Sequence, residues 1–392
     1  MWQEKQLIMK SFEEKFGNKF FLEHFGVNYL YKPKFFDEFE EIMSLDILDS
    51  MLSKTNIWNN KNFIMMLDQK KLNYGDYSSI SMETTGNNYR PDVNKVENLV
   101  ARGASIILNE IEKHNKNLLK IADDLQNLTN GRCQGNLYFS MASHQAFGPH
   151  FDLHDVFAIH FEGEKVWNIY ENIEKNPINH PVFKLSSEDR KKRAGNIIDQ
   201  VTLRPGDLLY IPRGQYHDAL ASKNGAIHIA FGLSYFKPID MMTTLWEKFI
   251  INDFMREDIG IRPSENEVKK SLLRLSNEIS NVINSEEAIN DVTKNIKQWP
   301  YQIKNFSLKS LLSEGPVYLV DKSVKFEKSK NKSFLKSPKA LVEIPQKFET
   351  IIEFLMRQET ISKNTIKNEF KNMSNDIIDE CIENLKKMSV IK

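Results

Sequence analysis

The sequence predicts an α+β protein, in which a sandwich or barrel of short β-strands is followed by a helical region and a small C-terminal unit. The first observation is a series of short apolar segments with a period of two, separated by turn residues, between residues 135 and 234. The second is an apolar stripe of helical spacing behind a capping box at 264–267. The third is a set of three short helical patterns near the C-terminus, from Phe348 to Met388.

The composition is that of a folded globular chain. Of the 392 residues, 41% are hydrophobic and 27% are charged, and the formal net charge is zero. A chain without net charge has no global field that draws it onto nucleic acid or an anionic membrane, so any such partner must be met by a local patch. Cys133 and Cys381 are too few and too far apart for a disulfide framework or a thiolate metal site, which indicates reduced thiols.

The N-terminus and the hydropathy of the chain bear on its location. Charged residues occupy the first turns in place of an apolar signal core, and no stretch approaches the roughly twenty apolar residues that a membrane span requires. We therefore expect a soluble, cytoplasmic protein that does not bind membranes.

The elements before and within the strand-rich part are expected as follows. Residues 1–93 contain many aromatic side chains in mixed short elements. Residues 94–128 place apolar residues three and four apart, which predicts helix throughout that stretch. Short strands are then expected at 136–140, 156–161, 165–170, 208–211 and 226–234.

The C-terminal half is expected to be helical. Val268, Leu272 and Leu275 begin the apolar stripe, which requires a partner helix, either within the chain or across a dimer. The stretch from Lys322 to Lys339 has seven lysines and one acid, which is typical of a solvated loop. Three helices and a strand then resemble a small winged-helix unit. Direct DNA binding by its third helix is disfavoured, because that helix is rich in acidic residues.

The segment Gly148-Pro-His150-Phe-Asp152 carries the candidate chemistry. Side chains two apart on a strand point to the same face, so His150 and Asp152 can offer an imidazole nitrogen and a carboxylate oxygen to one ion. His217, which follows the turn–strand–turn unit 205–214, is the best candidate for a third ligand. Two histidines and one carboxylate leave the opposite face of an iron open, as non-haem iron(II) oxygenases require. A closed zinc site is the alternative, but no fourth ligand stands out.

The residues around this segment resemble a known family, the JmjC/cupin ribosomal oxygenases. The resemblance is carried by Asn136-x-Tyr138, Gly148-Pro-His150-x-Asp152, Asp155-Val-Phe157, Glu162-Gly-Glu-Lys165-x-Trp167, and Pro205-Gly-Asp207 leading through Pro212-Arg-Gly214 to His217. It is dense from about 94 to 235. It implies a double-stranded β-helix (cupin/jelly-roll, JmjC) barrel, Fe(II) as the metal, and 2-oxoglutarate and O₂ as co-substrates. It also implies hydroxylation of a protein side chain, with ribosomal proteins as the expected substrates.

Three residues match the iron ligands of the family, namely His150, Asp152 and His217. Lys165 matches the basic residue that binds the distal carboxylate of 2-oxoglutarate. A cation there is chemically reasonable, because the remote charge of a dicarboxylate must be paired. Without the resemblance, the sequence would favour a solvated turn position for Lys165.

Two further residues match positions that line the co-substrate pocket, namely Tyr138 and Asn136. The alternative is a tyrosine of the barrel core with a polar neighbour. The sequence departs from the family at Ala230 and Gly232, where relatives often have Ser or Thr, so one polar contact to the co-substrate is expected to be missing or to come from elsewhere.

The remaining histidines of this part are not expected to bind metal. His154 and His160 flank the motif, and His154 shares its alternation but is taken as a pocket or surface residue. The others are taken as packed or exposed: His144, His180 and His228.

Family members also carry a helical dimerisation region and a C-terminal winged-helix unit. The resemblance therefore predicts an oxygenase domain over 1–238, a helical region that can form a homodimer over 239–315, and a winged-helix-like domain over 316–392. Three alternative functions remain open. The first is a peptide-tailoring or small-molecule hydroxylase, and the second is an N-methyl-lysine demethylase on the same scaffold. The third, a metal-binding cupin without turnover, is disfavoured by the intact ligand set together with Lys165.

Overall fold

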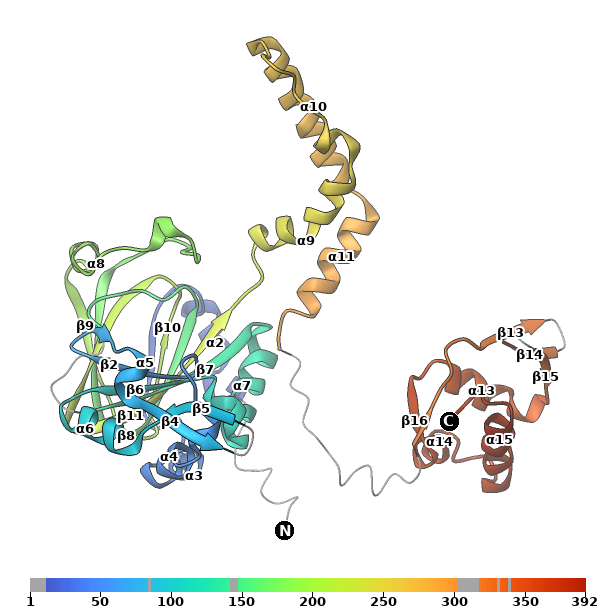
Figure 1. Ribbon diagram of the computed structural model, residues 1–392, viewed down its shortest axis with the longest axis horizontal. Helices are drawn as coiled ribbons and strands as arrows, with labels where there is room; N and C mark the ends of the chain where they lie inside the picture. Colours follow the sequence, from blue (N-terminus) through green and yellow to red (C-terminus); the bar gives the residue numbers. More distant parts are fainter. Residues whose placement is uncertain (1–11, 84–85, 142–146, 302–316, 330–331, 338–339) are drawn as a thin grey trace. The chain divides into compact units, whose positions relative to one another are not determined.

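The computed structural model describes residues 12–83, 86–141, 147–301, 317–329, 332–337 and 340–392 (Figure 1). The chain divides into two compact units, Met1–Ile303 and Lys304–Lys392, and each is described by itself. No helix in the described ranges is both long enough and apolar enough to cross a membrane. The three-part division at 238 and 315 is not the same as this two-unit division and stays a prediction.

The first unit is built on an antiparallel nine-stranded sheet with the order β1-β10-β8-β11-β7-β6-β2-β3, in which β9 also pairs with β8. Its strands are β1 (Leu30–Lys32), β2 (Phe63–Leu67), β3 (Lys70–Lys71), β6 (Ser105–Asn109), β7 (Arg132–Ser140), β8 (Asp155–Ile173), β9 (Ile197–Leu203), β10 (Leu208–Ile211) and β11 (Gln215–Ser234). The expected strands are confirmed, although the second and third are continuous as β8. Sheet and helices together give the expected α+β class.

The two longest strands, β8 and β11, pair with each other and bend at the same place, so that the sheet curls on itself (Figure 1). Gly163 of β8 and Gly225 of β11 both have positive φ, at 65° and 80°. A Cβ atom on Gly163 would lie 2.0 Å from the carbonyl oxygen of Gly225, which no side chain can tolerate. Glycine is therefore required where the two strands approach this closely. The bend lets β8 pair with β10 before it and with β9 after it.

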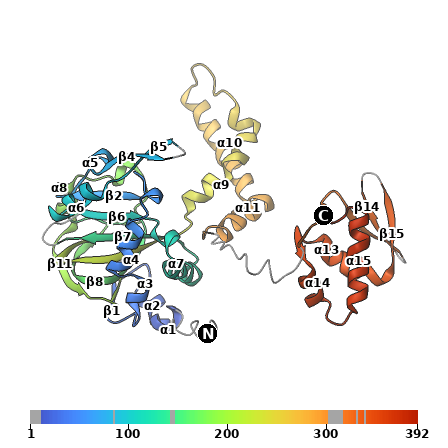
Figure 2. The ribbon, with the colours of Figure 1, turned by 60° about the horizontal axis from the view of Figure 1, so that its bottom comes forward.

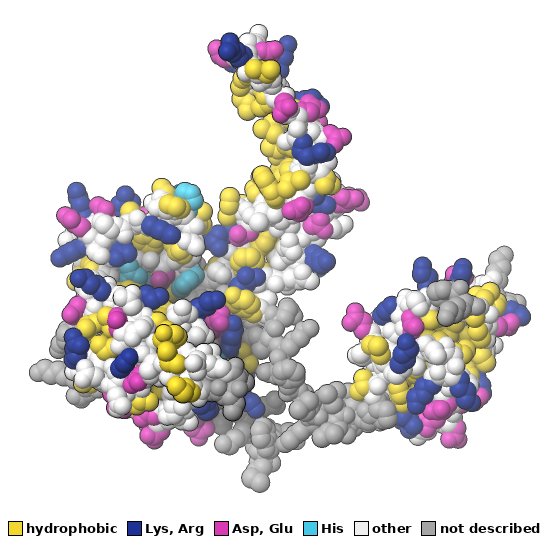
Figure 3. Space-filling model, viewed as in Figure 1, with side chains coloured by type: hydrophobic (Ala, Val, Ile, Leu, Met, Phe, Trp, Pro, Cys, Tyr) yellow, Lys and Arg dark blue, Asp and Glu magenta, His cyan; other side chains and the backbone are white. Residues whose placement is uncertain are grey.

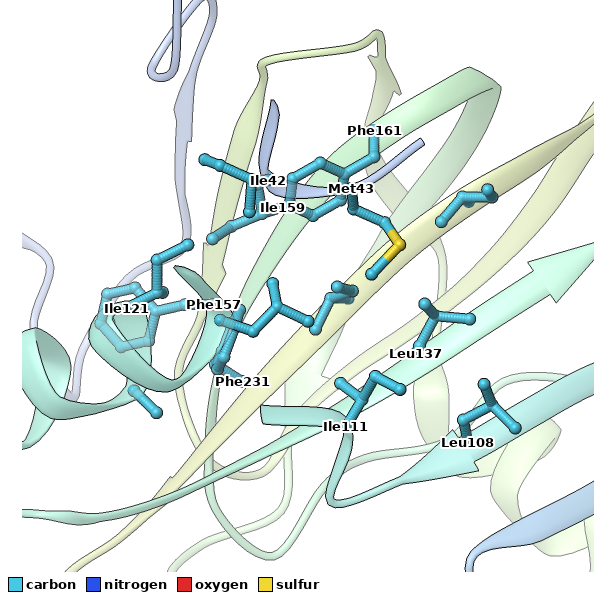
Figure 4. Close-up of a cluster of buried hydrophobic side chains, with 14 of the residues drawn as sticks. Ile42, Met43, Leu108, Ile111, Ile121, Leu137, Phe157, Ile159, Phe161 and Phe231 are labelled. Atoms are coloured by element: carbon cyan, nitrogen blue, oxygen red, sulfur yellow. The ribbon is translucent and has the colours of Figure 1, made fainter. Parts of the chain in front are cut away.

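One face of the sheet packs into the main hydrophobic core (Figure 4). Phe157, Ile159 and Phe161 of β8 alternate toward this core and are fully buried. The helices that flank the sheet and its strand-to-strand connections are shown in Figures 1 and 2: α1 (Phe12–Phe16), α2 (Asn18–Glu23), α3 (Phe39–Ile42), α4 (Leu45–Leu52), α5 (Tyr74–Tyr77), α6 (Val93–Ala101), α7 (Lys116–Thr129) and α8 (Ser187–Ala194). A separate hairpin is formed by β4 (Ser78–Glu83) and β5 (Gly86–Pro91).

The prediction of helix throughout 94–128 is wrong in its middle. Residues 105–109 form the strand β6 between α6 and α7, and β6 pairs with β2 and β7. An apolar run such as Ile106-Ile107-Leu108 satisfies helical spacing as well as a buried strand does. Ser105 to Leu108 are all buried, and β-branched residues favour the strand in that setting.

A helical segment follows the sheet, with α9 (Pro238–Ile251), α10 (Glu265–Ile283) and α11 (Glu286–Lys297). The capping box is confirmed, because Oε2 of Glu267 accepts a hydrogen bond of 2.7 Å from the backbone N–H of Ser264. Leu245, Phe249 and Ala288 form the small core that joins α9 to α11.

The second unit has its own hydrophobic core and contains α13 (Glu349–Met356), α14 (Lys363–Glu369) and α15 (Asn375–Lys387), which confirms the three expected helices. Its strands are β12 (Val317–Leu319), β13 (Lys325–Ser329), β14 (Lys332–Lys336), β15 (Leu341–Ile344) and β16 (Thr360–Ser362). The expected loop over 322–339 is wrong, since β13 and β14 pair within it. The lysines of this stretch that the structure describes are nevertheless exposed, because alternate residues of β14, Ser333 and Leu335, supply the buried face of that strand.

Candidate metal centre

The ligand-bearing segment before β8 is held against the start of β11 by backbone hydrogen bonds. The N–H of His150 donates to the carbonyl of His217 at 3.0 Å, and the N–H of His217 donates to the carbonyl of His150 at 2.8 Å. The N–H of Gly214 donates to the carbonyl of Asp152 at 3.1 Å. These bonds bring two segments more than 60 residues apart into register, and so they position the side chains that the motif singled out.

The structure brings His150, Asp152 and His217 together. One ligand atom from each of the three lies within 4.8 Å of the others. Nε2 of His217 is 3.5 Å from Oδ2 of Asp152, and the two imidazole centroids are 4.5 Å apart. Among the described residues, this is the one cluster of histidine, cysteine or acidic side chains with such a geometry.

Hydrogen bonds fix the tautomers of both histidines. Nδ1 of His150 lies 2.9 Å from the carbonyl oxygen of Gly148, and Nδ1 of His217 lies 2.9 Å from that of Gln215. A carbonyl oxygen can only accept, so Nδ1 carries the proton in each ring. The lone pair of Nε2 is thereby left for a metal, which is the usual orientation of a metal-binding histidine.

The charge states also suit a cation. Desolvation in the pocket raises the pKa of Asp152, but the imidazoles of His154, His217 and His150 outweigh it, so its pKa lies below the ordinary value. Burial, followed by the neighbouring His150, lowers the pKa of His217 to about 4. At neutral pH the carboxylate is ionised and His217 is neutral, and these are the forms that bind a divalent metal.

A cavity of about 160 Å³ opens beside these ligands. Its lining is Tyr138, Phe147, His150, Asp152, Val156, Lys165, Trp167, His217, Ala219, His228 and Ala230. A larger cavity of about 590 Å³ lies by α4 and α6 but is mostly apolar, and the described residues form no metal-binding cluster there. We therefore place the chemistry in the smaller cavity.

Lys165 lies inside this cavity, and the alternative of a solvated turn residue is wrong. Its side chain comes from β8 and the residue is only 5% exposed. Nζ of Lys165 is 3.4 Å from Nδ1 of His228 and 5.9 Å from the centroid of the Tyr138 ring. Burial lowers the pKa of Lys165 to about 7.

Tyr138 and Asn136 lie two residues apart on β7, as expected, but they differ in their relation to the cavity. Tyr138 lines it, and its ring stacks on His228 with centroids 4.8 Å apart and 10° between the planes. Asn136 is not part of the lining. Its Oδ1 is buried and has no hydrogen-bond partner among the residues that the structure describes.

His228 was not among the predicted site residues, but it is 3% exposed and lines the cavity. The signal was present, because His228 lies two residues before Ala230 on β11, and residues two apart share a face. Ala230 lines the cavity as expected, whereas Gly232 does not. A Cβ atom on Gly232 would lie 2.6 Å from the ring of His154, so glycine makes room for that imidazole.

The other histidines do not join the metal cluster. Nδ1 of His154 is 3.2 Å from the carbonyl oxygen of Asp155. His160 is buried behind the cavity, with Nε2 3.0 Å from the carbonyl oxygen of Gly163. His180 is exposed at the start of a short 3₁₀ turn. His144 lies outside the described residues.

Comparison with known proteins agrees with this geometry. Residues 107–241 match the family model described as JmjC domain. The chain is 32% identical over 215 residues to the bifunctional lysine-specific demethylase and histidyl-hydroxylase NO66 of Dictyostelium discoideum, covering 54% of this chain and 39% of that protein. It is 29% identical over 161 residues to ribosomal oxygenase 2 of Mus musculus, covering 41% of this chain and 33% of that protein. The chain thus spans well under half the length of these curated relatives.

Solved structures share the fold. The structure of YcfD, a ribosomal oxygenase from Escherichia coli in complex with cobalt and 2-oxoglutarate, matches with a TM-score of 0.50 and 14% identity. The match covers 95% of this chain and 97% of that chain. A second structure of the same E. coli protein matches with a TM-score of 0.50 and 15% identity. The resemblance indicated by the motifs is confirmed.

Proposed function

We propose that this chain is an Fe(II)- and 2-oxoglutarate-dependent dioxygenase that hydroxylates a protein side chain, because residues 107–241 match the family model described as JmjC domain. The observation that carries the proposal is the convergence of His150, Asp152 and His217 at one end of a cavity whose other end holds the buried Lys165. We propose the first three as the iron ligands and Lys165 as a co-substrate-binding residue.

The ligand set suits iron(II). Two Nε2 atoms and one carboxylate would hold the ion and would leave it able to bind co-substrate and dioxygen. When bound, iron with 2-oxoglutarate and O₂ supplies the oxidation, in which one oxygen atom enters succinate, one enters the substrate hydroxyl, and carbon dioxide is released. The protein holds the ligands in their metal-binding tautomers through the carbonyls of Gly148 and Gln215.

The far end of the cavity suits the second carboxylate of 2-oxoglutarate. Lys165 is the cation there, and no ion pair joins it to an acidic side chain within the described part of the chain. Tyr138 forms the neighbouring wall. Asn136 is proposed for the same pocket on weaker support, namely its unpartnered Oδ1 and its shared strand face with Tyr138.

For the substrate we propose a ribosomal protein, because two of the relatives are named as ribosomal oxygenases. N-methyl-lysine demethylation is the second candidate, since the relative from Dictyostelium is named both as a demethylase and as a hydroxylase. Mass spectrometry of ribosomal proteins and of methylated lysine peptides after incubation with the enzyme separates them. A mass gain of one oxygen supports the first activity, and loss of a methyl group supports the second.

We further propose the three-part organisation given by the sequence, with an oxygenase domain (1–238), a helical dimerisation region (239–315) and a winged-helix-like domain (316–392) in a cytoplasmic homodimer. Large apolar side chains are exposed on α9 and α10 (Figure 3): Trp246, Ile251, Leu272 and Leu273. In the second unit, three helices and a β-hairpin support a winged-helix arrangement. The acidic side chains Asp376, Asp379 and Glu383 on α15 argue against DNA binding by that helix.

Sedimentation velocity tests the dimer. Leu272→Asp places a charge on the exposed apolar face, so the wild-type protein should sediment as a dimer and the variant as a monomer. A monomeric wild-type protein at micromolar concentration contradicts the proposal.

Anaerobic titration with Fe(II) and 2-oxoglutarate tests the proposed activity at its first step. The wild-type protein should develop the visible charge-transfer band of the iron–2-oxoglutarate chelate, and His150→Ala should not. A wild-type protein that binds metal normally but shows no band would instead be a metal-binding cupin.

A further inference from the structure

The larger cavity of the first unit, of about 590 Å³, lies between α4 and α6. Leu52 of α4 and Val96 and Val100 of α6 form its apolar walls. Its floor consists of side chains from three neighbouring strands, β2, β6 and β7: Phe63, Ile106 and Phe139. Ligand-binding pockets typically have volumes of roughly 300–1,000 Å³, so this cavity can hold a bulky side chain of a partner.

The helix α6 leaves part of its apolar stripe open to this cavity. Val93, Val96 and Val100 recur at spacings of three and four, as in a helix that buries one face. Within α6, which the structure describes in full, only Leu99 is buried. Val93 is 57% exposed, and the three valines of the stripe all line the cavity. An apolar stripe that faces an open cavity indicates a surface for contact with a partner.

Both helices also place a carboxylate at the cavity, Asp49 from α4 and Glu97 from α6. Both residues are exposed, and no ion pair joins either of them to a base within the described part of the chain. No lysine, arginine or histidine is among the described residues that line the cavity. An apolar cavity with an acid on each of two walls is complementary to an apolar side chain that has cations on either side.

The sequence connects this cavity closely with the metal centre. Tyr138 and Phe139 are adjacent on β7, and Tyr138 lines the metal cavity whereas Phe139 lines the larger one. Met141 lines the larger cavity, and Phe147, six residues further along the chain, lines the metal cavity. Six residues span at most about 20 Å, so a partner segment of about ten extended residues can reach from one cavity to the other.

We propose that the cavity between α4 and α6 binds a basic segment of the protein substrate, with an apolar side chain in the cavity and a cationic side chain at each acid. This inference rests on the proposed function and adds the chemistry of the substrate to it. The apolar side chain packs against Val96, Val100 and Phe139, and the cations pair with Asp49 and Glu97. The cavity thus binds the substrate at a distance from the reacting side chain.

The test uses the full-length protein and a fluorescently labelled synthetic peptide that contains the unit Gly-Lys-Leu-Lys-Gly twice, with fluorescence anisotropy as the measurement. The variant Asp49→Lys/Glu97→Lys reverses both charges at exposed positions, so the fold should be unaffected. It should bind the peptide about tenfold more weakly than the wild-type protein, because two attractive ion pairs become repulsive. The matched control Glu23→Lys/Glu286→Lys has the same change in charge at exposed positions outside the cavity, and it should bind within about threefold of the wild-type protein.

Two further peptides test the chemistry of the ligand. A peptide with serine in place of leucine should bind about tenfold more weakly to the wild-type protein, because the apolar contact is lost. A peptide with glutamate in place of lysine should not bind. Equal affinities of the lysine peptide for the wild-type protein and the cavity variant, or equal binding of the glutamate peptide, would overturn the inference.

Two measurements on the same variants separate this inference from its alternatives. Sedimentation velocity should give one oligomeric state for all three proteins, and loss of a dimer in the cavity variant alone would make the cavity an interface between copies and overturn the proposal. Anaerobic titration with Fe(II) and 2-oxoglutarate should give the same charge-transfer band in all three. A wild-type protein that binds the lysine peptide but gives no band would overturn the proposed function and not the peptide site.

Mass-spectrometric rates of hydroxylation of ribosomal proteins connect the cavity with the substrate. The cavity variant should have a KM about tenfold higher than the wild-type value and an unchanged kcat, because only binding away from the reacting atoms is lost. An unchanged KM would remove the substrate from this cavity.

Discussion

The two ends of the cavity are prepared in different ways. At the metal end, backbone hydrogen bonds between the segments of His150 and His217 set the spacing, and the carboxylate of Asp152 is positioned to offset the charge of a metal. At the end proposed for the co-substrate, Lys165 and His228 come from separate strands and no acid offsets the cation within the described residues. The metal end is thus complete in its donors, whereas the co-substrate end lacks an anion.

This difference predicts how each end responds to substitution. Loss of a metal ligand removes a donor that nothing else supplies. Loss of a basic side chain at the other end should weaken the binding of 2-oxoglutarate but leave the metal bound. The three variants or conditions that follow separate the two ends, beginning with the largest effect.

Asp152→Ala should abolish hydroxylation and weaken Mn(II) binding by more than about 100-fold, because even residues that only orient metal ligands contribute 10–100-fold. Metal titration followed by mass spectrometry of the substrate measures both effects. The exposed carboxylate of Asp253 offers a control, since Asp253→Ala should leave metal binding unchanged. Full activity in Asp152→Ala would remove this residue from the ligand set.

Lys165→Ala should weaken 2-oxoglutarate binding by about 100-fold, since a buried charge pair that loses one partner typically costs several kcal/mol. Mn(II) affinity should stay within about threefold of the wild-type value. Calorimetric titration of each ligand measures both, and Lys191→Ala on the exposed face of α8 is the control. A parallel loss of metal affinity would show that the two ends are not independent.

The pH dependence of co-substrate binding should be the smallest of these effects near neutrality. Burial lowers the pKa of Lys165 to about 7, so the free protein carries the charge below pH 7 and loses it above. His228, Tyr138 and His160 face Lys165 and bring no negative charge at these pH values. The dissociation constant for 2-oxoglutarate should be flat below pH 7 and rise up to about tenfold per unit above it.

Lys165→Arg should remove this dependence, because a guanidinium stays charged over the whole range. Its dissociation constant should then be flat from pH 6 to pH 9, whatever its absolute value. A wild-type dissociation constant that does not change between pH 7 and pH 9 would show that Lys165 is fully charged before the ligand binds.

The metal end was predictable from sequence because its residues lie in short motifs with a fixed local geometry. His150 and Asp152 share five consecutive residues with a glycine and a proline, and His217 follows a turn that the sequence marks clearly. His228 has no such context, since its role depends on two strands that the chain forms earlier and on a lysine 63 residues away. The alternation places His228 on the same strand face as Ala230, but its pairing with Lys165 is set by the tertiary structure.

The errors in secondary structure have the same origin. The strand β6 and the hairpin of β13 and β14 are stabilised by pairing with distant or neighbouring strands. Ile106 and Ile107 fit either periodicity, and an exposed lysine-rich hairpin resembles a solvated loop in composition. Local patterns therefore identified these residues as buried or solvated correctly, but they did not identify the strands.

The crossing of Gly163 and Gly225 also inverts the alternation of both long strands. In β8 the even-numbered Val156 faces the cavity before the glycine, and the odd-numbered Lys165 and Trp167 face it afterwards. In β11 the change runs from odd, at Ala219, to even, at His228 and Ala230. The bend at these two glycines thus changes, in both strands, whether odd-numbered or even-numbered residues face the cavity. Removal of one residue beside either glycine would reverse which side chains face the cavity along the rest of that strand. A side chain of the hydrophobic core would then lie where a basic side chain now lines the cavity.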